Sequence, residues 1–397
     1  MRGLINREAY IVSAVRSAVG KMNGSLSLVN PEEFGAAIFS AAMERSGVRP
    51  EWIDEVIVSE NYRTGKTASN ISRVIALRAG LPIQVPAYTV NMHCGGSLKG
   101  LMLASQAIRS GDADAILVGG IELMSQTAYF LTDMRRGDKT GDRVIRDPLA
   151  AADPISGMTM GETAEKLAAD FHISRDEQDR FALRSQQRAA RALQLELFKE
   201  EIIPVSVKSP KGHKFVFEVD EHPRPQTTLE DLQKLKPVFS ENGSATAGNS
   251  CGMSDGASAA VIVSDQLAYE RGLAPLARIV SYASAGVEPS IMGIGTVFAA
   301  RKALQKAELS ITDIDLIELN EAFASQCIYF IREMNPNLER LNVNGGAIAL
   351  GHPIAATGGI LLAKLVHELR RRNGRYGLIT MCVGGGQGVA MIIDAKV

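Results

Sequence analysis

Two stretches of the chain, residues 88–120 and 341–386, present the same order of predicted elements. Each opens on a short strand, passes through a glycine-rich turn into a helix (residues 97–109 and 357–371), and ends on an apolar strand that runs into glycines. Two copies of one such unit are expected to form two similar sheets, each with its own buried strands. The repeat therefore predicts an α/β fold of two similar halves, in which the second copy begins with a strand at residues 342–344.

The segments that precede the two copies match as well. Residues 33–47 have a helical pattern that leads to an apolar strand at residues 56–58, and residues 299–307 lead likewise to residues 315–318. Helices that alternate with fully apolar strands indicate sheets covered on both faces. Such folds build their sites in loops at the carboxyl ends of strands, so the two glycine-rich turns are expected to lie at equivalent strand ends.

Residues 124–247 break this pattern. They contain a charged, loop-like run at residues 133–147 and a strongly helical span at residues 173–200, followed by segments rich in proline and lysine. Because this stretch has an apolar periodicity of its own, it indicates an inserted domain rather than a linker. The predicted division is an N-terminal half of residues 1–123 and 248–272, an inserted loop domain of residues 124–247, and a C-terminal half of residues 273–397.

Charge and composition exclude several kinds of partner. The 397 residues carry 43 Lys and Arg against 44 Asp and Glu, and aromatic residues make up 5%. This balance offers nucleic acid neither a basic field nor a base-stacking surface. No window approaches the ~20 apolar residues of a membrane span, and the first residues lack the apolar stretch of a signal peptide. Four cysteines without a close pair favour reduced thiols in a cytoplasmic protein.

Four short motifs place reactive or polar side chains beside glycines, where the backbone can turn tightly and approach a substrate. They are His-Cys-Gly-Gly-Ser at residues 93–97, Asn-Glu-Ala-Phe-Ala at 320–324, Gly-His-Pro at 351–353, and Cys-Val-Gly-Gly-Gly-Gln-Gly at 382–388. Two cysteines and a histidine suit a reaction that stores an acyl group as a thioester and also moves a proton on carbon.

Each motif also has a purely structural interpretation. An isolated cysteine is usually a small buried hydrophobe, but Cys94 directly precedes a predicted helix, whose N-terminus lowers the pKa of a thiol. His352 lies in a rigid Gly/Pro turn opposite the cysteine turn of the repeat, which favours a base that forms the thiolate over a packed histidine. Asn320 can cap the helix that follows it.

Three other chemistries fit poorly. The glycines after Cys382 suggest a dinucleotide-binding loop, but that pattern needs a glycine where Val389 stands, and only nine residues follow the motif. Gly65-Lys66-Thr67 has the form of the end of a phosphate-binding loop, but the required first glycine is Glu60. No short ligand pair is present to start a metal site at the two cysteines and the histidine. We therefore expect no metal and no cofactor.

In this order the four motifs resemble those of the thiolases, the acyl-CoA:acetyl-CoA C-acyltransferases, and the resemblance runs over nearly the whole chain. It implies a five-layer αβαβα core of two similar halves with an inserted loop domain. It also implies that Cys94 is the nucleophile, that His352 activates it, and that Cys382 is the acid/base at the Cα of acetyl-CoA. In the family the N–H groups of Cys94 and Gly384 form an oxyanion hole, and Asn320 holds a water beside the enolate oxygen.

The resemblance further implies ping-pong acyl transfer: condensation of acetyl-CoA, or thiolytic cleavage of a 3-ketoacyl-CoA by CoA. It implies a homodimer, with a dimer of dimers left open, and no nucleic acid or membrane partner. The residues that match the family's CoA contacts are Met160, Arg224, Phe239, Ala247, Cys251, Met292 and Phe323.

The chain departs from the family pattern in places. Residues 94–97 read Cys-Gly-Gly-Ser where the family usually has Cys-Gly-Ser-Gly, Cys251 replaces a serine, and residues 64–72 are unusual. These departures leave open a catalytically weak paralogue that binds acyl-CoA or serves as a subunit of a complex. Two further alternatives fit less well: a decarboxylating ketosynthase would lack the second cysteine, and an NAD-dependent oxidoreductase would need the missing dinucleotide loop.

Overall fold

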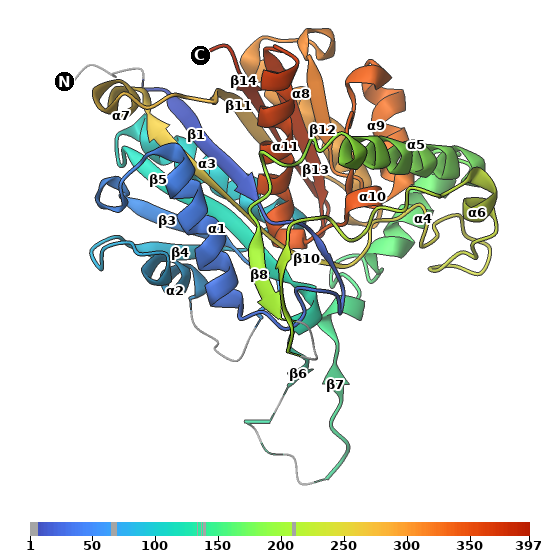
Figure 1. Ribbon diagram of the computed structural model, residues 1–397. Coiled ribbons are helices and arrows are strands. Elements are labelled where there is room, and N and C mark those ends of the chain that lie inside the picture. The colour runs from blue at the N-terminus through green and yellow to red at the C-terminus, as the bar shows by residue number, and fades with distance from the viewer. Residues whose placement is uncertain (1–6, 65–69, 133, 136, 138–139, 209–211) are drawn as a thin grey trace.

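A computed structural model describes residues 7–64, 70–132, 134–135, 137, 140–208 and 212–397 (Figure 1). The first half contains β1 Ala9–Arg16, β2 Gly20–Lys21, α1 Pro31–Ser46, β3 Glu55–Ser59, α2 Ile71–Arg78, β4 Ala87–Val90, α3 Gly96–Ser110, β5 Ala115–Leu123, β10 Ser254–Ser264 and α7 Asp265–Arg271. The second half contains β11 Ala277–Gly286, α8 Gly295–Ala307, β12 Leu316–Leu319, α9 Ala324–Met334, α10 Ala347–Leu350, α11 Thr357–Arg371, β13 Tyr376–Val383 and β14 Gln387–Asp394.

The order of the strands repeats between the two halves, as the sequence predicts. The first half runs β4-β3-β5-β10-β1 and the second runs β12-β13-β14-β11. In both, the parallel pairs (β4, β3 and β5; β12 and β13) are followed by antiparallel ones. The halves join where β1 pairs antiparallel with β11 at Tyr10 with Arg278 and Ile11 with Ala277.

The strand predicted at residues 342–344, the counterpart of β4, is not formed. Only Leu341 bridges to Ile317 of β12, and the chain then turns with Asn342 at a φ of 46°. The side chain of Asn342 takes the place of strand pairing, because its Oδ1 accepts from the N–H of Leu319 (2.8 Å) and its Nδ2 donates to the carbonyl of Leu319 (2.9 Å). Asparagine tolerates this backbone conformation, so the amide satisfies the strand edge without a second strand.

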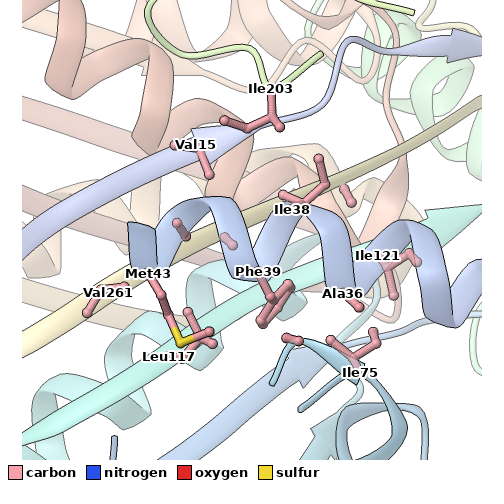
Figure 2. Packing of buried hydrophobic residues seen from close by; sticks show 14 of the residues in the cluster. Val15, Ala36, Ile38, Phe39, Met43, Ile75, Leu117, Ile121, Ile203 and Val261 are labelled. Atoms are coloured by element: carbon pink, nitrogen blue, oxygen red, sulfur yellow. The ribbon is translucent and has the colours of Figure 1, made fainter. Parts of the chain in front are cut away.

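Three large apolar cores hold the five layers together. The first core lies between α1 with α2 and the strands of the first half. In Figure 2, Ala36, Phe39 and Met43 of α1 face the strand residues Leu117 and Ile121. Their spacing of three and four residues is that of one buried helix face. A middle core joins the strands of both halves to α3 and α11, and the last core lies under α8 and α9. The predicted αβαβα arrangement is confirmed.

The contact between α3 and α11 brings two of the motifs together. A Cβ atom placed on Gly358 of α11 would lie 2.4 Å from the backbone nitrogen of Leu98 in α3, so only glycine allows this approach. The N–H of Gly359 donates to Oγ of Ser97 (3.1 Å). The N-termini of α3 and α11 therefore meet, and with them the turns that carry Cys94 and His352.

The inserted segment contains β6 Phe130–Leu131, β7 Ile145–Arg146, α4 Met160–Asp170, α5 Arg175–Gln194, β8 Val205–Lys208, β9 Lys214–Phe217 and α6 Leu229–Gln233. Figure 1 shows β6 and β7 extending from the body of the molecule. Fully buried Arg16 of β1 anchors the segment, since its Nε lies 2.7 Å from a Glu201 carboxylate oxygen and its Nη1 lies 2.7 Å from Oδ1 of Asp220. The three domain boundaries stay a prediction. Among the described helices, none is long and apolar enough to cross a membrane.

Candidate active site

Three turns from distant parts of the chain meet at one place. Cys94 lies in the short 3-10 helix His93–Gly95, which contacts both the strand β13 and the 3-10 helix Ile354–Ala356 that follows His352. Cys382 is the penultimate residue of β13. A Cβ atom on Gly95 would lie 2.9 Å from Cγ2 of Val383, so the cysteine turn needs a glycine to pack against the end of β13. The fold thus places both thiols and the histidine in one region.

Burial decides the protonation state of Cys94. Removal from water raises the pKa of this thiol to about 11, and backbone N–H groups, first that of Gly384 and then that of Cys94, oppose the shift. The N–H groups at this turn lower the pKa of Cys94, as expected, but burial outweighs them. A neutral thiol at pH 7 needs a base to become a nucleophile.

His352 is placed and polarised to be that base. Its Nδ1 lies 2.6 Å from Oγ1 of Thr357, and this hydroxyl donates its single proton to the carbonyl of Pro353 (2.9 Å). Thr357 can therefore only accept from the imidazole, which fixes the proton on Nδ1 and leaves a lone pair on Nε2. Burial lowers the pKa of His352 to about 4, so the ring is neutral at pH 7.

Asn320 lies beside the same nitrogen. It directly follows β12, and its Nδ2 is 3.4 Å from Nε2 of His352. The capping interpretation of Asn320 is wrong, because α9 begins only at Ala324 and its cap residue Phe323 makes no side-chain capping bond. Oδ1 of Asn320 is buried and has no hydrogen-bond partner in the described part of the chain. A buried acceptor in this position is suited to hold a water or a ligand donor.

Cys382 is the more deeply buried thiol. Burial raises its pKa well above the ordinary value, and the neighbouring Cys94 and Cys251 add to the shift. Its Sγ donates to Oε1 of Gln326 at 3.8 Å, and the same oxygen accepts from the N–H of Ala322 at 3.1 Å. The sequence analysis missed Gln326. Its only signal was a glutamine on the apolar face of a predicted helix, where a polar side chain needs buried partners.

Four predicted CoA contacts surround Cys382. Met292 and Phe323 are buried with it in one small apolar cluster, and Met160 and Phe239 pack against that cluster. The rings of Phe239 and Phe323 meet edge to face with centroids 6.0 Å apart. Such a cluster can receive the apolar part of a thioester beside the thiol.

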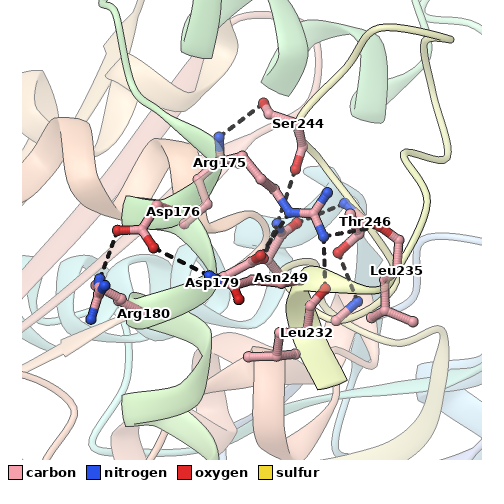
Figure 3. Close-up of polar contacts among 12 residues, drawn as sticks. Arg175, Asp176, Asp179, Arg180, Leu232, Leu235, Ser244, Thr246 and Asn249 are labelled. Carbon is pink, nitrogen blue, oxygen red and sulfur yellow. Dashed lines mark hydrogen bonds and ion pairs between the residues drawn. The ribbon is translucent and has the colours of Figure 1, made fainter. Parts of the chain in front are cut away.

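The other CoA candidates are held by the inserted segment. Figure 3 shows how Arg175 and Asp179 of α5 fix the turn that contains Ala247: Nδ2 of Asn249 donates to Asp179 (3.0 Å), and Asn249 Oδ1 accepts from the N–H of Thr246 (2.7 Å). The N–H of Cys251 donates to the carbonyl of Ala322 at 3.0 Å. Burial raises the pKa of Cys251 to about 12. Ala247 is exposed on this turn.

Arg224 lies apart from the apolar cluster. Its backbone N–H donates to Oε1 of Gln186 in α5 at 2.9 Å, and its carbonyl accepts from the N–H of Thr227 at 3.1 Å. The residue is exposed. An exposed guanidinium on the inserted segment can reach a phosphate in solvent, and it takes no part in the buried site.

The Gly-Ser order after Cys94 has a physical explanation. A Cβ atom on Gly96 would lie 1.8 Å from Oγ of Ser59, so the serine of β3 occupies the space that a side chain at residue 96 would need. Ser97 is fully buried and accepts from Gly359. The exchanged pair therefore belongs to the packing of α3 against β3 and α11.

Glu122 of β5 is a second residue that the sequence analysis missed. It is fully buried, its Oε1 accepts from the N–H of Tyr62 and its Oε2 from the N–H of Ala355, each at 3.1 Å. Burial raises its pKa to about 8. Through Ala355 this carboxyl group supports the turn that follows His352, and a buried acid inside an apolar strand was its signal.

Three other kinds of site were considered from the sequence: a metal site, a dinucleotide-binding loop and a phosphate-binding loop. In the described part of the chain, no three His, Cys, Asp or Glu side chains are grouped to hold a metal ion. The glycines after Cys382 form the turn between β13 and β14, and no helix follows them. Residues 65–67 of the phosphate-loop alternative, with most of the unusual segment 64–72, lie outside the described residues.

Two family models match the chain: "Thiolase, N-terminal domain" at residues 9–266 and "Thiolase, C-terminal domain" at residues 273–395. An acetyl-CoA acetyltransferase of Pseudomonas aeruginosa is 47% identical over 392 residues, which are 98% of this chain and 99% of the relative. One of Escherichia coli K12 is 45% identical over 394 residues, with 98% and 99% covered.

Solved structures agree with these matches. A crystal structure of human mitochondrial 3-ketoacyl-CoA thiolase is 43% identical and superposes with a TM-score of 0.96, covering 99% of this chain and all of the other. The same human protein in complex with CoA gives a TM-score of 0.95 at 42% identity, with 99% of each chain covered. The similarity thus includes the sequence as well as the fold, and it covers nearly the whole chain.

Proposed function

The chain belongs to the thiolase family and is an acyltransferase, and we propose that it transfers an acetyl group between two CoA thioesters through an acyl-Cys94 intermediate. The observation that carries this proposal is that two neutral thiols and a neutral histidine, whose lone pair is on Nε2, lie in turns that meet at one place. Curated relatives of nearly full length are acetyl-CoA acetyltransferases, which supports acetyl-CoA as the substrate.

In the first half-reaction, Nε2 of His352 takes the proton of the Cys94 thiol, and the thiolate attacks the carbonyl carbon of acetyl-CoA. The oxygen becomes negative in the tetrahedral intermediate, and the N–H groups of Cys94 and Gly384 are its proposed donors. The N–H of Gly384 already approaches the sulfur of Cys94, which supports this assignment. Collapse of the intermediate leaves acetyl-Cys94 and releases CoA, which takes up the proton of Cys382, so that Cys382 becomes a thiolate while His352 keeps the proton of Cys94.

In the second half-reaction, the Cys382 thiolate takes a proton from the Cα atom of another acetyl-CoA, and the carbanion attacks acetyl-Cys94, whose sulfur leaves as a thiolate and regains its proton from His352. The enolate oxygen is stabilised by Nε2 of His352, protonated at this stage, and by a water that Oδ1 of Asn320 holds. The buried, unsatisfied Oδ1 supports this role. In the reverse direction, Cys94 cleaves a 3-ketoacyl-CoA and Cys382 protonates the departing enolate.

The proposal also covers CoA binding, oligomeric state, location and domain division. Met160, Phe239, Met292 and Phe323 bind the pantetheine arm, Ala247 and Cys251 border it, and Arg224 meets the phosphates of CoA. We propose a cytoplasmic homodimer in lipid metabolism, with a dimer of dimers left open. The predicted division into two halves and a loop domain of residues 124–247 belongs to this proposal. The weak-paralogue alternative receives no support.

A thiolysis assay tests the proposal with acetoacetyl-CoA and a longer 3-ketoacyl-CoA, on the native protein and on Cys94→Ala and Cys382→Ala. We expect the native protein to turn over and both variants to be inactive. Mass spectrometry after incubation with acetyl-CoA should find an acetyl group on Cys94 in Cys382→Ala and none in Cys94→Ala. A native protein that binds CoA but cleaves neither substrate would favour the weak-paralogue alternative over the proposed activity.

A further inference from the structure

A histidine outside the four motifs fills a slot against the catalytic turn. The imidazole of His222 comes from the inserted segment and lies between Gly252 and Gly351. A Cβ atom on Gly252 would be 2.5 Å from Cε1 of His222, and one on Gly351 would be 2.5 Å from its Cδ2. Both glycines are therefore required for the ring to fit, and Gly351 is the residue directly before His352.

One hydroxyl joins this ring to the backbone of His352. Oγ of Ser254 lies 2.8 Å from Nε2 of His222, donates to the carbonyl of Gly252 (2.7 Å), and accepts from the N–H of His352 (2.9 Å). The imidazole of His222 also bonds to the backbone of Gly20, so the ring is held on both sides. Ser254 therefore links the ring of His222 to the N–H of His352.

The ring is itself held from the side of the inserted segment. His222 follows Asp220, whose carboxylate binds Arg16 and accepts from the N–H of Val19 at 2.7 Å. The N–H of Glu221 donates to the carbonyl of Val19 at 3.0 Å. The position of the imidazole is thus set by contacts to the first half, and its hydrogen bond to Ser254 of β10 connects it to the His352 turn of the second half.

We propose that His222 is a positioning residue, which holds the Gly351–His352 turn through Ser254 so that Nε2 of His352 faces the thiol of Cys94. It does not touch the reacting atoms in this assignment. The predicted change in turnover rests on the proposed function. The positioning itself concerns only the pair His352 and Cys94, and it can be measured without acyl transfer.

The test compares His222→Phe, which keeps the size of the ring but removes its hydrogen bond, with His222→Gln, whose amide can form one from a similar position. We expect His222→Phe to lower kcat about tenfold with little change in KM, and His222→Gln to retain most of the native kcat. Ser254→Ala should resemble His222→Phe, and the double variant should lose no more than either single one. His172→Gln, an exposed histidine of the same segment, is the control.

Alkylation of Cys94 by iodoacetamide supplies a readout that does not depend on turnover. We expect His222→Phe to slow alkylation at neutral pH, where His352 must assist, and to leave the rate unchanged above the pKa of Cys94, where the thiolate forms without a base. Equal slowing at both pH values, or a Gln variant as impaired as Phe, would overturn the proposal. An inactive native protein with the expected alkylation pattern would instead refute the proposed function alone.

Discussion

At the residue scale, the position of one proton decides what His352 can do. Thr357 accepts from Nδ1 because its own proton is committed to Pro353, so the lone pair faces Asn320 on the other side of the ring. An imidazole with the opposite tautomer would present an N–H to Cys94 and could not accept its proton. The hydroxyl of Thr357 therefore selects the reactive form of a residue five positions away.

Replacement of Thr357 separates this effect from packing. Thr357→Val keeps the shape but removes the acceptor, and we expect kcat/KM for thiolysis to fall by about 10- to 100-fold, less than the ~10²- to 10⁴-fold of a complete acid–base contribution, because the imidazole itself remains. Thr357→Ser keeps the hydroxyl and should retain most of the activity. Steady-state kinetics with acetoacetyl-CoA checks both variants. A valine variant as active as the serine variant would show that the tautomer is fixed by other contacts.

The buried state of His352 also predicts how stability depends on pH. Its pKa is lowered from 6.5 to about 4 by burial, so the unfolded chain takes up a proton before the folded one as the pH falls. Stability from this group is fully present above pH 6.5 and is lost progressively between pH 6.5 and 4, by about 3 kcal/mol in total. In His352→Asn, the midpoint of thermal unfolding, measured by circular dichroism, should change less with pH between 6.5 and 4 than in the native protein. An unchanged slope would contradict the assignment.

At the element scale, the close packing of α3 on β3 explains the exchanged Gly-Ser order. Gly96→Ser places a side chain on Oγ of Ser59, and we expect a loss of about 1–3 kcal/mol in the free energy of unfolding. The double variant Ser59→Gly, Gly96→Ser should recover most of the loss because the clash is removed. Urea denaturation of the two single variants and the double variant gives the coupling. Additive losses would mean that the two positions do not compete for one space.

The elements themselves differ in how far sequence determines them. The helix predicted at residues 357–371 is α11 at the same residues, because the Gly/Pro turn before it and Asn373-Gly374 after it are local signals. The strand at 342–344 fails because Asn342 satisfies Leu319 with its side chain, which a strand pattern does not encode. The pKa of Cys94 was missed for a related reason, since burial depends on Val383 and other distant neighbours. His222 lies 32 positions from Ser254, and no local pattern relates them.

At the scale of the whole molecule, one buried ionic group ties the inserted segment to the core. Arg16 of β1 binds Glu201 and Asp220, and its guanidinium lies 5.0 Å from the ring of Phe198. The segment that it anchors leads to His222 and, farther along the chain, to the turn with Ala247 and Cys251. The proposed CoA contacts Ala247 and Cys251 thus follow a segment that Arg16 of the first half anchors.

Arg16→Met tests this dependence. The substitution keeps an apolar chain but leaves two buried carboxylates without their cation, and we expect a loss of about 3–5 kcal/mol in the free energy of unfolding. Limited proteolysis should cut the inserted segment faster, and KM for the CoA substrate should rise. The matched control is Arg180→Met, which breaks the exposed pair with Asp176 on α5 and should change little. Equal losses in the two variants would mean that the buried group adds no more than a surface pair, and that the inserted segment is held by apolar packing.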